Sequence, residues 1–433
     1  MGDYISLSAE IQGFVDTFRI SSCKQTQQIY AYNPLTGIHE PVDEVELSKM
    51  IDDYINSGMS ALDWTDHHMT VIMKYIRTKA PYYETMGKRG VTVMKNGSFH
   101  WKDAKLHKHS PKDRAIASLE VDYDPNAKCP IFDRFISTLA NGDSNLEMTL
   151  FQIAGCVASH SLKARRLVTL VSSGGSGKSV YLKILEALSG ALYTSNLSIS
   201  EINNPNRAFD RCALLNSRLN VIHELDSNET LNSIFSANVK KIVSGEDISC
   251  ERKFGARITF TPAISMILVA SNHCPTFESM PSESIRRRLL ILNITKTLSP
   301  AEQDPDLFKK IKENEMPGIF NKAVYYYQML KENNFVFASE ADSRAFVDKQ
   351  IIDSFPMYFF VTKHIVVKPG HKLFNDFTRQ KYIEWAAKND IDVPLDKSSL
   401  MKKLESTIQK CHLPFLRGKD NGERYLMGID YKE

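Results

Sequence analysis

The sequence lacks the features that mark several large classes of protein, beginning with paired cysteines. Seven cysteines occur in 433 residues, at the scattered positions 23, 129, 156, 212, 250, 274 and 411. No two of them form a C-x-x-C pair, so a zinc finger of the common type is not expected. A chain of this length does not need a disulfide framework either, and the cysteine usage fits a reducing compartment.

Long apolar runs and an excess of one charge are also absent. No apolar run approaches the roughly 20 residues of a membrane span, and the first residues, MGDYISLS, carry no secretory signal. We therefore expect no membrane partner. The 54 Lys and Arg residues nearly balance the 51 Asp and Glu residues, which leaves a net charge of +3. A nucleic-acid surface on this protein must therefore be local.

The composition is that of a globular protein with more than one domain. Hydrophobic residues make up 42% of the chain and charged residues 24%, which are ordinary values. A length of 433 residues implies two or three domains. Helical patterns begin after about residue 110, and strands then alternate with helices to about residue 330, which predicts an α/β fold.

A glycine-rich stretch between an apolar run and an amphipathic run is the strongest local signal. It reads RLVTLVSSGGSGKSVYLKILEALSG, from Arg166 to Gly190. The run Leu167 to Val171 is typical of a buried strand, and the residues that follow Lys178 have helical spacing up to the capping Gly190. A glycine-rich turn from strand to helix is the context of the phosphate-loop pattern G-x-x-x-x-G-K-[ST]. The alternative is a glycine-rich surface turn that binds nothing.

One position departs from that pattern, because Ser172 stands where the first glycine is expected. The remaining glycines still allow the backbone to approach a phosphate closely. We expect Lys178 to neutralise the β- and γ-phosphates of ATP, and the Ser179 hydroxyl to hold Mg²⁺. The expected ATP-binding residues are Ser173, Gly174, Gly175, Ser176, Gly177, Lys178, Ser179 and Val180.

A second buried strand, Leu219 to Ile222, is followed by two carboxylates, Glu224 and Asp226. Hydrolysis of a bound nucleotide needs one acidic group to position Mg²⁺ and a group that orients the attacking water. We assign the main role, including metal binding, to Glu224 and keep Asp226 as the second catalytic carboxylate. An exposed acidic turn after a strand is the alternative interpretation.

A basic hairpin is predicted after the acidic strand end. The segments ISCERKF and RITFTP flank Gly255-Ala256, as the two strands of a β-hairpin would. Cations beside an aromatic ring suit a nucleic-acid backbone with base stacking, although a solvated hairpin end would have similar residues. The expected DNA-binding residues at its tip are Arg252, Lys253, Phe254 and Arg257.

Two polar features close this series. A third apolar strand, Met266 to Ala270, is followed by Asn272, whose neutral amide can hydrogen-bond the attacking water or the γ-phosphate. Arg286, Arg287 and Arg288 then precede another apolar strand. Taken alone, such an arginine run is most often a solvated surface.

The order of these features resembles that of the superfamily 3 helicases, a branch of the AAA+ ATPases found in viruses, phages and plasmids. The whole series fits within about 115 residues. The similarity is closer to the primase-helicase group of phages and poxviruses. In that group a helical lead resembles YDPNAKCPIFDRF, Tyr123 to Phe135, and a later pattern matches Lys241, Gly245 and Asp247. The resemblance covers roughly residues 110 to 430.

The resemblance implies a homo-hexameric ring that binds ATP and Mg²⁺ between subunits. One subunit would supply the phosphate loop, Glu224 and Asn272. The next subunit would supply Arg287 or Arg288 to stabilise the transition state. Hydrolysis would move the hairpin along one strand of single-stranded or forked DNA, with an expected 3′ to 5′ polarity. The resemblance also implies the cytoplasm of a bacterial host cell, and a separate primase or polymerase as a partner.

The C-terminal region is predicted to be a winged helix. Two amphipathic helical segments are followed by a strand, an Asn421-Gly422 turn and another strand. Such a domain would bind duplex DNA, for example an origin, although a protein-binding winged helix is the alternative because the region is nearly charge-balanced. Its expected DNA-binding residues are Lys402, Lys403 and Lys410 on the recognition helix and Arg417 and Lys419 on the wing.

The N-terminal region mixes strand and helix patterns, including a hairpin signal at Asn96-Gly97. Its role as a collar, a partner-binding module or a DNA-binding module stays open. The motif DWTD, Asp63 to Asp66, is not the D-x-D that primase chemistry uses, so we predict no primer synthesis. The expected parts are an N-terminal domain (1–110), a helical lead-in for oligomerisation (111–162), an AAA+ ATPase core (163–332) and a winged helix (333–433).

Two other classes of function remain to be distinguished from a helicase. A replication initiator would bind origin DNA and use ATP only as an assembly switch. A phosphate-loop enzyme such as a kinase would act on a small molecule, which the basic hairpin and the winged helix argue against. Strand separation on a forked duplex distinguishes a helicase from an initiator. Stimulation of ATP hydrolysis by single-stranded DNA distinguishes it from a small-molecule enzyme.

Overall fold

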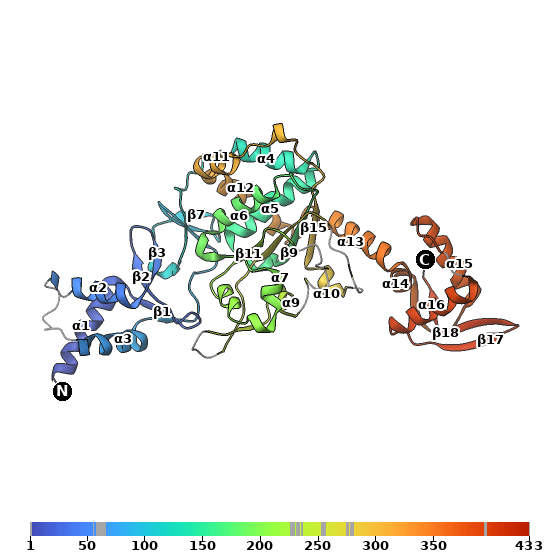
Figure 1. Ribbon diagram of the computed structural model, residues 1–433, viewed down its shortest axis with the longest axis horizontal. Helices are drawn as coiled ribbons and strands as arrows, with labels where there is room; N and C mark the ends of the chain where they lie inside the picture. Colours follow the sequence, from blue (N-terminus) through green and yellow to red (C-terminus); the bar gives the residue numbers. More distant parts are fainter. Residues whose placement is uncertain are drawn as a thin grey trace. The chain divides into compact units, whose positions relative to one another are not determined.

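The computed structural model gives the chain a mixed α/β fold (Figure 1). The structure describes residues 2–54, 56–57, 66–225, 230, 234, 237–252, 257–273, 277, 281–393 and 396–432. The chain divides into two compact units. The first comprises Met1–Ser227, Ile234–Cys274 and Arg288–Glu340, and the second comprises Asn228–Ser233, Pro275–Arg287 and Ala341–Glu433.

A parallel five-stranded sheet forms the centre of the first unit. Its strands are β9 (Arg166–Val171), β10 (Thr194–Ser195), β11 (Leu219–Ile222), β14 (Met266–Ser271) and β15 (Leu289–Asn293). They lie in the order β10-β11-β14-β9-β15, and every neighbouring pair is parallel. Strands buried on both faces of a parallel sheet have continuous apolar sequences, and every residue of β11 and β14 is buried. The three strands expected from apolar runs are therefore confirmed.

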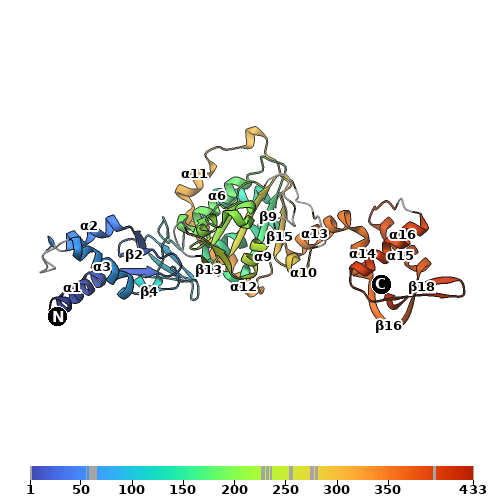
Figure 2. The same ribbon diagram turned by 60° about the horizontal axis from the view of Figure 1, so that its bottom comes forward.

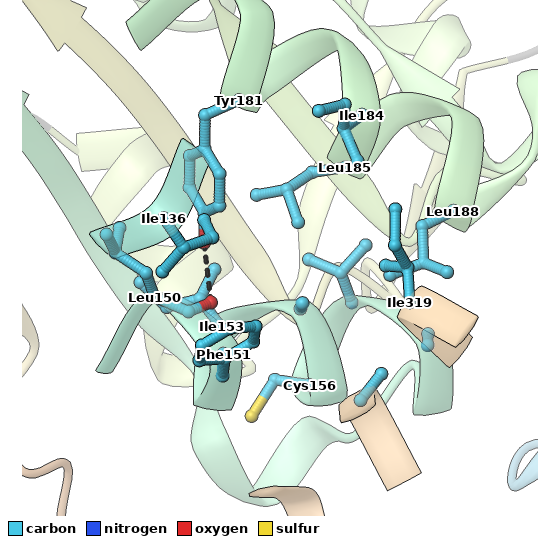
Figure 3. Packing of buried hydrophobic residues seen from close by; sticks show 14 of the residues in the cluster. Ile136, Leu150, Phe151, Ile153, Cys156, Tyr181, Ile184, Leu185, Leu188 and Ile319 are labelled. Carbon is cyan, nitrogen blue, oxygen red and sulfur yellow. Dashed lines mark hydrogen bonds between the residues drawn. The ribbon is translucent and has the colours of Figure 1, made fainter. Parts of the chain in front are cut away.

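The main hydrophobic core against this sheet draws on helices α4 (Pro130–Ala140), α5 (Ser144–Ser159), α6 (Lys178–Ser189) and α12 (Met316–Glu332). Figure 3 shows Tyr181 of α6 pointing toward α5, where its hydroxyl donates a 2.7 Å hydrogen bond to the carbonyl oxygen of Leu150. Tyr181 is fully buried, so this bond satisfies a hydroxyl that water cannot reach. It also joins α6, the helix that follows the glycine-rich loop, to the core.

The rest of the sheet-bearing part consists of short elements around the core. Strands β12 (Ile248–Cys250) and β13 (Ile258–Phe260) pair antiparallel, which confirms the predicted hairpin. The other elements are η3 (Leu162–Ala164), η4 (Ala191–Tyr193), α7 (Ile199–Asn203), η5 (Pro205–Arg207), η6 (Asp210–Leu214), α9 (Ala237–Ser244), η7 (Pro300–Glu302) and α11 (Leu307–Asn314).

Two small sheets make up the N-terminal region, in the orders β3-β2-β1-β4 and β7-β6-β5-β8. Figure 2 shows helices α1 to α3 beside the first of them. The elements are α1 (Gly2–Phe18), β1 (Ser21–Cys23), β2 (Ile29–Asn33), β3 (Ile38–Val42), α2 (Glu44–Tyr54), α3 (Asp66–Lys79), β4 (Tyr82–Tyr83), β5 (Val91–Met94), β6 (Gly97–His100), β7 (Lys105–His107), η2 (Pro111–Asp113) and β8 (Ser118–Leu119).

The hairpin predicted near Asn96 is confirmed, with a shift of one residue in its turn. Met94 pairs with Gly97, so Lys95 and Asn96 form the turn and Gly97 begins β6. The Thr92 hydroxyl of β5 donates to the carbonyl oxygen of Ala158 at 2.7 Å and accepts from the indole of Trp101 at 2.9 Å. These buried bonds join the second small sheet to the end of α5.

The helical pattern expected from about residue 110 begins later than predicted. Residues 111–129 contain only the short η2 and the strand β8, and the first long helix of this stretch, α4, starts at Pro130. Two prolines and local turns interrupt helix formation before that point, since the Asp124 side chain accepts from the Asn126 backbone at 2.9 Å. Helices α4 and α5 then follow one another closely.

A distant carboxylate caps the start of α4. The N-cap residue Cys129 makes no side-chain capping bond. Instead, Glu315 accepts the backbone N–H groups of Ile131 at 2.9 Å and Phe132 at 2.7 Å. Both groups belong to the first turn of the helix, which has no intrahelical acceptors for them. Glu315 thereby fixes α4 to the junction of α11 and α12.

The second unit contains four helices and a three-stranded antiparallel sheet in its C-terminal part. Asn421 and Gly422, both with positive φ, form the predicted two-residue turn between its last two strands. No helix among the described residues is long and apolar enough to cross a bilayer. The elements are α10 (Glu283–Arg286), α13 (Glu340–Ser354), α14 (Pro356–His364), β16 (Ile365–Phe374), α15 (Asn375–Lys388), α16 (Lys397–Lys410), β17 (Leu416–Asp420) and β18 (Glu423–Tyr431).

Replacing Glu315 by Gln should destabilise the first unit by about 1–3 kcal/mol, because an amide leaves one of two buried N–H donors without an acceptor. Urea unfolding followed by circular dichroism measures this change. The matched control is Glu313→Gln, at an exposed position on the same short stretch, which should alter stability by less than about 0.5 kcal/mol. Equal stability of the two variants would contradict the capping role.

Candidate active site

The glycine-rich loop leaves the carboxyl end of β9 and enters α6 at Lys178. The connection after β9 leads toward β10 at one edge of the sheet, and the connection after β14 leads to β15 at the other edge. The strands β9 and β14 are neighbours and parallel, but the connections that follow them cross the sheet in opposite directions. In open α/β sheets, ligands bind outside the carboxyl ends of the strands at such a reversal.

A pocket of about 600 Å³ lies at this position. We call it the strand-end pocket. It joins most of the residues expected at a nucleotide site, from the loop, from the end of β11 and from the end of β14. Its lining includes Gly174, Gly175, Ser176, Gly177, Lys178, Ser179, Val180, Glu224 and Asn272.

Two glycines of the loop are required by its backbone. Gly175 and Gly177 have φ of +68° and +97°, in the left-handed region that favours glycine. A Cβ on Gly177 would also lie 3.0 Å from the ring of Phe135. Ser172 is not among the residues with positive φ, so its side chain causes no backbone strain. This explains why the first glycine of the pattern can be replaced.

Lys178 is almost fully buried at 6% exposure, and its ammonium group is held by the loop and by β14. It donates to the carbonyl oxygen of Ser172 at 3.0 Å, to the Ser172 hydroxyl, and to Oδ1 of Asn272 at 3.3 Å. The Ser172 and Ser176 hydroxyls are 2.8 Å apart. Burial lowers the pKa of Lys178. The acceptors that the described residues give Lys178 are neutral, and a phosphate group in the pocket would add a counter-charge.

Glu302 and Asp304 also line the strand-end pocket, where they form ion pairs with Lys296 and Lys310. Ser179 and Glu224 are the oxygen ligands beside the glycine-rich loop that fit a divalent metal. Both are exposed and both line the pocket. Among the described residues, no group of three or more His, Cys, Asp or Glu side chains could hold a metal ion. This donor set fits Mg²⁺, which is usually bound through one or two protein oxygens together with substrate phosphates and water.

His223, which lies between the end of β11 and Glu224, is a site residue that was not predicted from the sequence. Its imidazole lines the strand-end pocket, and Nε2 donates to the Glu186 carboxylate of α6 at 3.0 Å. The Asn196 amide also donates to the same carboxylate oxygen, at 2.7 Å. Its position in the sequence could have indicated this residue, since His223 follows the strand as directly as Glu224 does.

A second missed feature is the segment after β15, which covers the loop. The backbone N–H of Leu298 donates to the carbonyl oxygen of Gly175 at 3.1 Å. The hydroxyls of Ser173 and Thr297 lie 2.9 Å apart, so Ser173 contacts this segment and is not part of the pocket lining. The segment and α4 add apolar residues to the pocket lining (Phe135, Leu298, Pro300, Pro305 and Leu307), and the segment also adds the polar residues Glu302, Gln303 and Asp304.

The arginine cluster does not join the strand-end pocket within the first unit. Arg288 directly precedes β15, and its carbonyl oxygen accepts the N–H of Leu167 at 2.8 Å, near the beginning of β9. It therefore lies at the amino edge of the sheet. Strand β9 has 6 residues, so at about 3.3 Å per residue the two edges are roughly 20 Å apart. Arg287 is exposed and follows α10 in the second unit.

The remaining expected residues of the first unit are only partly described. Arg252 lies at the end of β12 and donates to the carbonyl oxygen of Gln25 in the N-terminal region. Arg257 is exposed just before β13. Lys253 and Phe254 at the hairpin tip, and Asp226, lie outside the described residues.

Five cations expected to bind DNA are exposed in the second unit. Helix α16 carries three of them on the side opposite its buried residues Leu400, Leu404 and Ile408. One of the two on β17, Arg417, forms a 2.9 Å ion pair with Glu405, which partly offsets its charge. The exposed cations are Lys402, Lys403, Lys410, Arg417 and Lys419.

Two family matches cover separate parts of the chain. Residues 65–140 match a family described as D5 N terminal like. Residues 170–288, which run from the end of β9 to the arginine cluster, match a family of unknown function (DUF5906).

The fold is similar to that of the solved C-terminal region of NrS-1, residues 305–718. One apo structure matches with a TM-score of 0.52 and 10% identity, over 97% of this chain and 98% of that chain. An A-form apo structure matches with a TM-score of 0.50 and 10% identity, over 95% and 96%. A further A-form structure matches with a TM-score of 0.51 and 11% identity, over 94% and 95%. The D5 N terminal-like match supports a relationship to D5-like proteins over residues 65–140, and the comparison with NrS-1 shows the fold.

The backbone of the loop predicts different outcomes at two of its glycines. Gly177→Ala should weaken ATP binding about tenfold or more, because of its left-handed φ and the nearby Phe135 ring. Gly174→Ala is the comparison within the loop, since a Cβ there meets no protein atom within 4 Å and φ is not positive; the loop backbone keeps its conformation, so the loss of binding should be clearly smaller. Titration with a fluorescent ATP analogue measures both. Equal losses would contradict this account of the loop.

Proposed function

We propose that this protein is an ATP-driven replicative DNA helicase of a phage or another mobile genetic element, in superfamily 3 of the AAA+ ATPases. The observation that carries the proposal is the strand-end pocket. It brings a glycine-rich loop, Lys178, Ser179, Glu224 and Asn272 to the carboxyl edge of one parallel sheet. That combination is what hydrolysis of a nucleotide triphosphate with a divalent metal needs.

Each polar group of the strand-end pocket has a distinct role in this proposal. The loop N–H groups and the start of α6 bind the phosphates. Lys178 leaves its internal acceptors and neutralises charge on the β- and γ-phosphates. Ser179 and Glu224 would hold Mg²⁺, which neutralises phosphate charge when bound, and Glu224 also orients the attacking water. Asn272 hydrogen-bonds that water or the γ-phosphate without opposing its charge.

Two features support DNA as the second substrate. The hairpin of β12 and β13 has Arg252 and Arg257 on the tip side of its paired strands. In the second unit, the order α14-β16-α15-α16-β17-β18, with three helices around a core shared with a three-stranded sheet, is the arrangement expected of a winged helix. We propose that the hairpin moves single-stranded DNA and that the winged helix binds duplex DNA through α16 and β17.

The position of the arginine cluster favours an assembly of several subunits. Arg288 lies at the sheet edge opposite its own strand-end pocket, so it can act on a nucleotide only in a neighbouring subunit. We therefore propose a ring, with a hexamer and 3′ to 5′ movement as expectations from the resemblance. The proposed setting is the cytoplasm of a bacterial host, with a separate primase or polymerase as a partner.

The comparisons support this proposal at the level of fold and family. The D5 N terminal-like match and the fold of the NrS-1 C-terminal region suggest a phage replication protein. The alternative proposal within that setting is an initiator that binds an origin and uses ATP only to assemble. It is favoured only by the second unit, whose exposed cations suit duplex DNA as well as a fork.

Lys178→Ala should reduce ATP hydrolysis by at least about 100-fold, because the transferred phosphate loses its main cation, and it should abolish fork unwinding. Lys183→Ala, an exposed position on the same helix, should retain both activities. Steady-state hydrolysis with and without single-stranded DNA, measured beside unwinding of a forked duplex, tests this. Hydrolysis without unwinding by the wild type would favour the initiator, and turnover by Lys178→Ala would rule out the assigned site.

Mixing inactive subunits tests whether the nucleotide site is shared. The ATP hydrolysis rates of Arg287→Ala and Arg288→Ala are first compared with that of the wild type. Whichever arginine variant is inactive is then mixed with Lys178→Ala subunits. Part of the hydrolysis should return, because one interface then combines an intact Lys178 with an intact arginine. The control mixture of Lys178→Ala and Glu224→Gln should stay inactive, since both changes affect the same side of the interface. Recovery in neither mixture would contradict an arginine supplied by a neighbour.

A further inference from the structure

A histidine and a carboxylate form a pair at the wall of the strand-end pocket that the proposed hydrolysis does not yet use. His223 follows β11 and Glu186 lies on α6, and Nε2 of the imidazole is 3.0 Å from Oε1 of the carboxylate. Asn196 donates to the same oxygen at 2.7 Å and to the carbonyl oxygen of Val221 at 3.3 Å. Two side chains therefore converge on Glu186 and fix its position beside the pocket.

The contact determines which nitrogen of His223 is free to act. An ionised carboxylate can only accept, so Nε2 carries the proton that is shared with Glu186. Nδ1 of the neutral ring then has a lone pair and acts as an acceptor or a metal ligand. A ring that keeps this lone pair cannot donate to a phosphate oxygen, which is also an acceptor. The free nitrogen suits a metal ion, and a carboxylate behind the imidazole is the usual support of a metal-binding histidine.

We propose that His223 is a ligand of the divalent metal that accompanies the nucleotide, with Glu186 as its positioning residue. The inference rests on the proposed nucleotide site. His223 lines the same pocket as Ser179 and Glu224, so one metal ion at the phosphates could receive an imidazole nitrogen together with two protein oxygens. The site would then differ from a phosphate-loop site whose protein ligands are all oxygens.

The chemical consequence is a changed metal preference. Mg²⁺ is a hard cation that favours oxygen ligands and gives up water reluctantly. Transition metals bind imidazole more readily, and their affinity increases along the first row from Mn²⁺. A nitrogen ligand should therefore favour Mn²⁺ over Mg²⁺ in the nucleotide complex. A purely structural pair, one that only ties α6 to β11, would have no effect on this preference.

The experiment compares nucleotide affinity in three conditions: Mg²⁺, Mn²⁺, and excess EDTA. A fluorescent ADP analogue is titrated against the wild type, His223→Gln, Glu186→Gln and the control Lys183→Ala. The wild type and the control should bind about tenfold more tightly with Mn²⁺ than with Mg²⁺. His223→Gln should lose most of this difference, and Glu186→Gln should lose part of it. Affinity in EDTA should be similar for all four proteins.

Electron spin-echo spectroscopy of the Mn²⁺–ADP complex gives a second readout that does not depend on activity. A directly bound imidazole nitrogen should modulate the echo in the wild type, and the modulation should be absent in His223→Gln. An unchanged ratio of Mn²⁺ to Mg²⁺ affinity in His223→Gln, or no nitrogen modulation in the wild type, would overturn the inference and leave the nucleotide site intact. Absence of nucleotide binding by the wild type in all three conditions would overturn both.

Discussion

The burial of the Lys178 ammonium group is the constraint on which the strand-end pocket depends. A desolvated cation must keep acceptors, and the loop provides them through the Ser172 carbonyl and hydroxyl while β14 provides Asn272. These acceptors come from two neighbouring strands, so the position of the lysine depends on the register of β9 and β14. The left-handed glycines let the loop curve tightly enough for the side chain to turn back. The geometry of the strand-end pocket and the core packing are therefore set by the same sheet.

The part of this site that sequence could predict is the part governed by strand ends. Parallel strands place their carboxyl ends at one edge, so residues that follow three apolar runs were expected together, and Lys178, Glu224 and Asn272 do line one pocket. The rule is geometric and needs only the strand assignment. By the same rule His223 belongs to this edge, because it follows β11 as directly as Glu224 does.

Other parts of the pocket could not be predicted because they come from contacts far apart in the sequence. Phe135 lies on α4, whose first turn is capped by Glu315, 183 residues beyond the capped Phe132. The segment after β15 covers the loop through backbone bonds that have no sequence signature. The late start of helices after residue 110 has a local cause, since turn-forming residues precede Pro130. Tertiary contacts thus decide the side of the pocket formed by α4 and the segment after β15, and strand ends decide the side that carries Lys178, Glu224 and Asn272.

The serine at position 172 shows which glycines of the phosphate-loop pattern the backbone conformation requires. The pattern has glycine at the position of Ser172, yet only Gly175 and Gly177 in this loop have a backbone that disfavours a side chain. At position 172 a side chain is allowed, and its hydroxyl contacts both Lys178 and Ser176. The departure therefore replaces a flexible residue with a polar one that helps to hold the buried lysine. A glycine of the motif is required only where a positive φ or a close contact excludes a side chain. In this loop Gly175 and Gly177 meet that condition and position 172 does not.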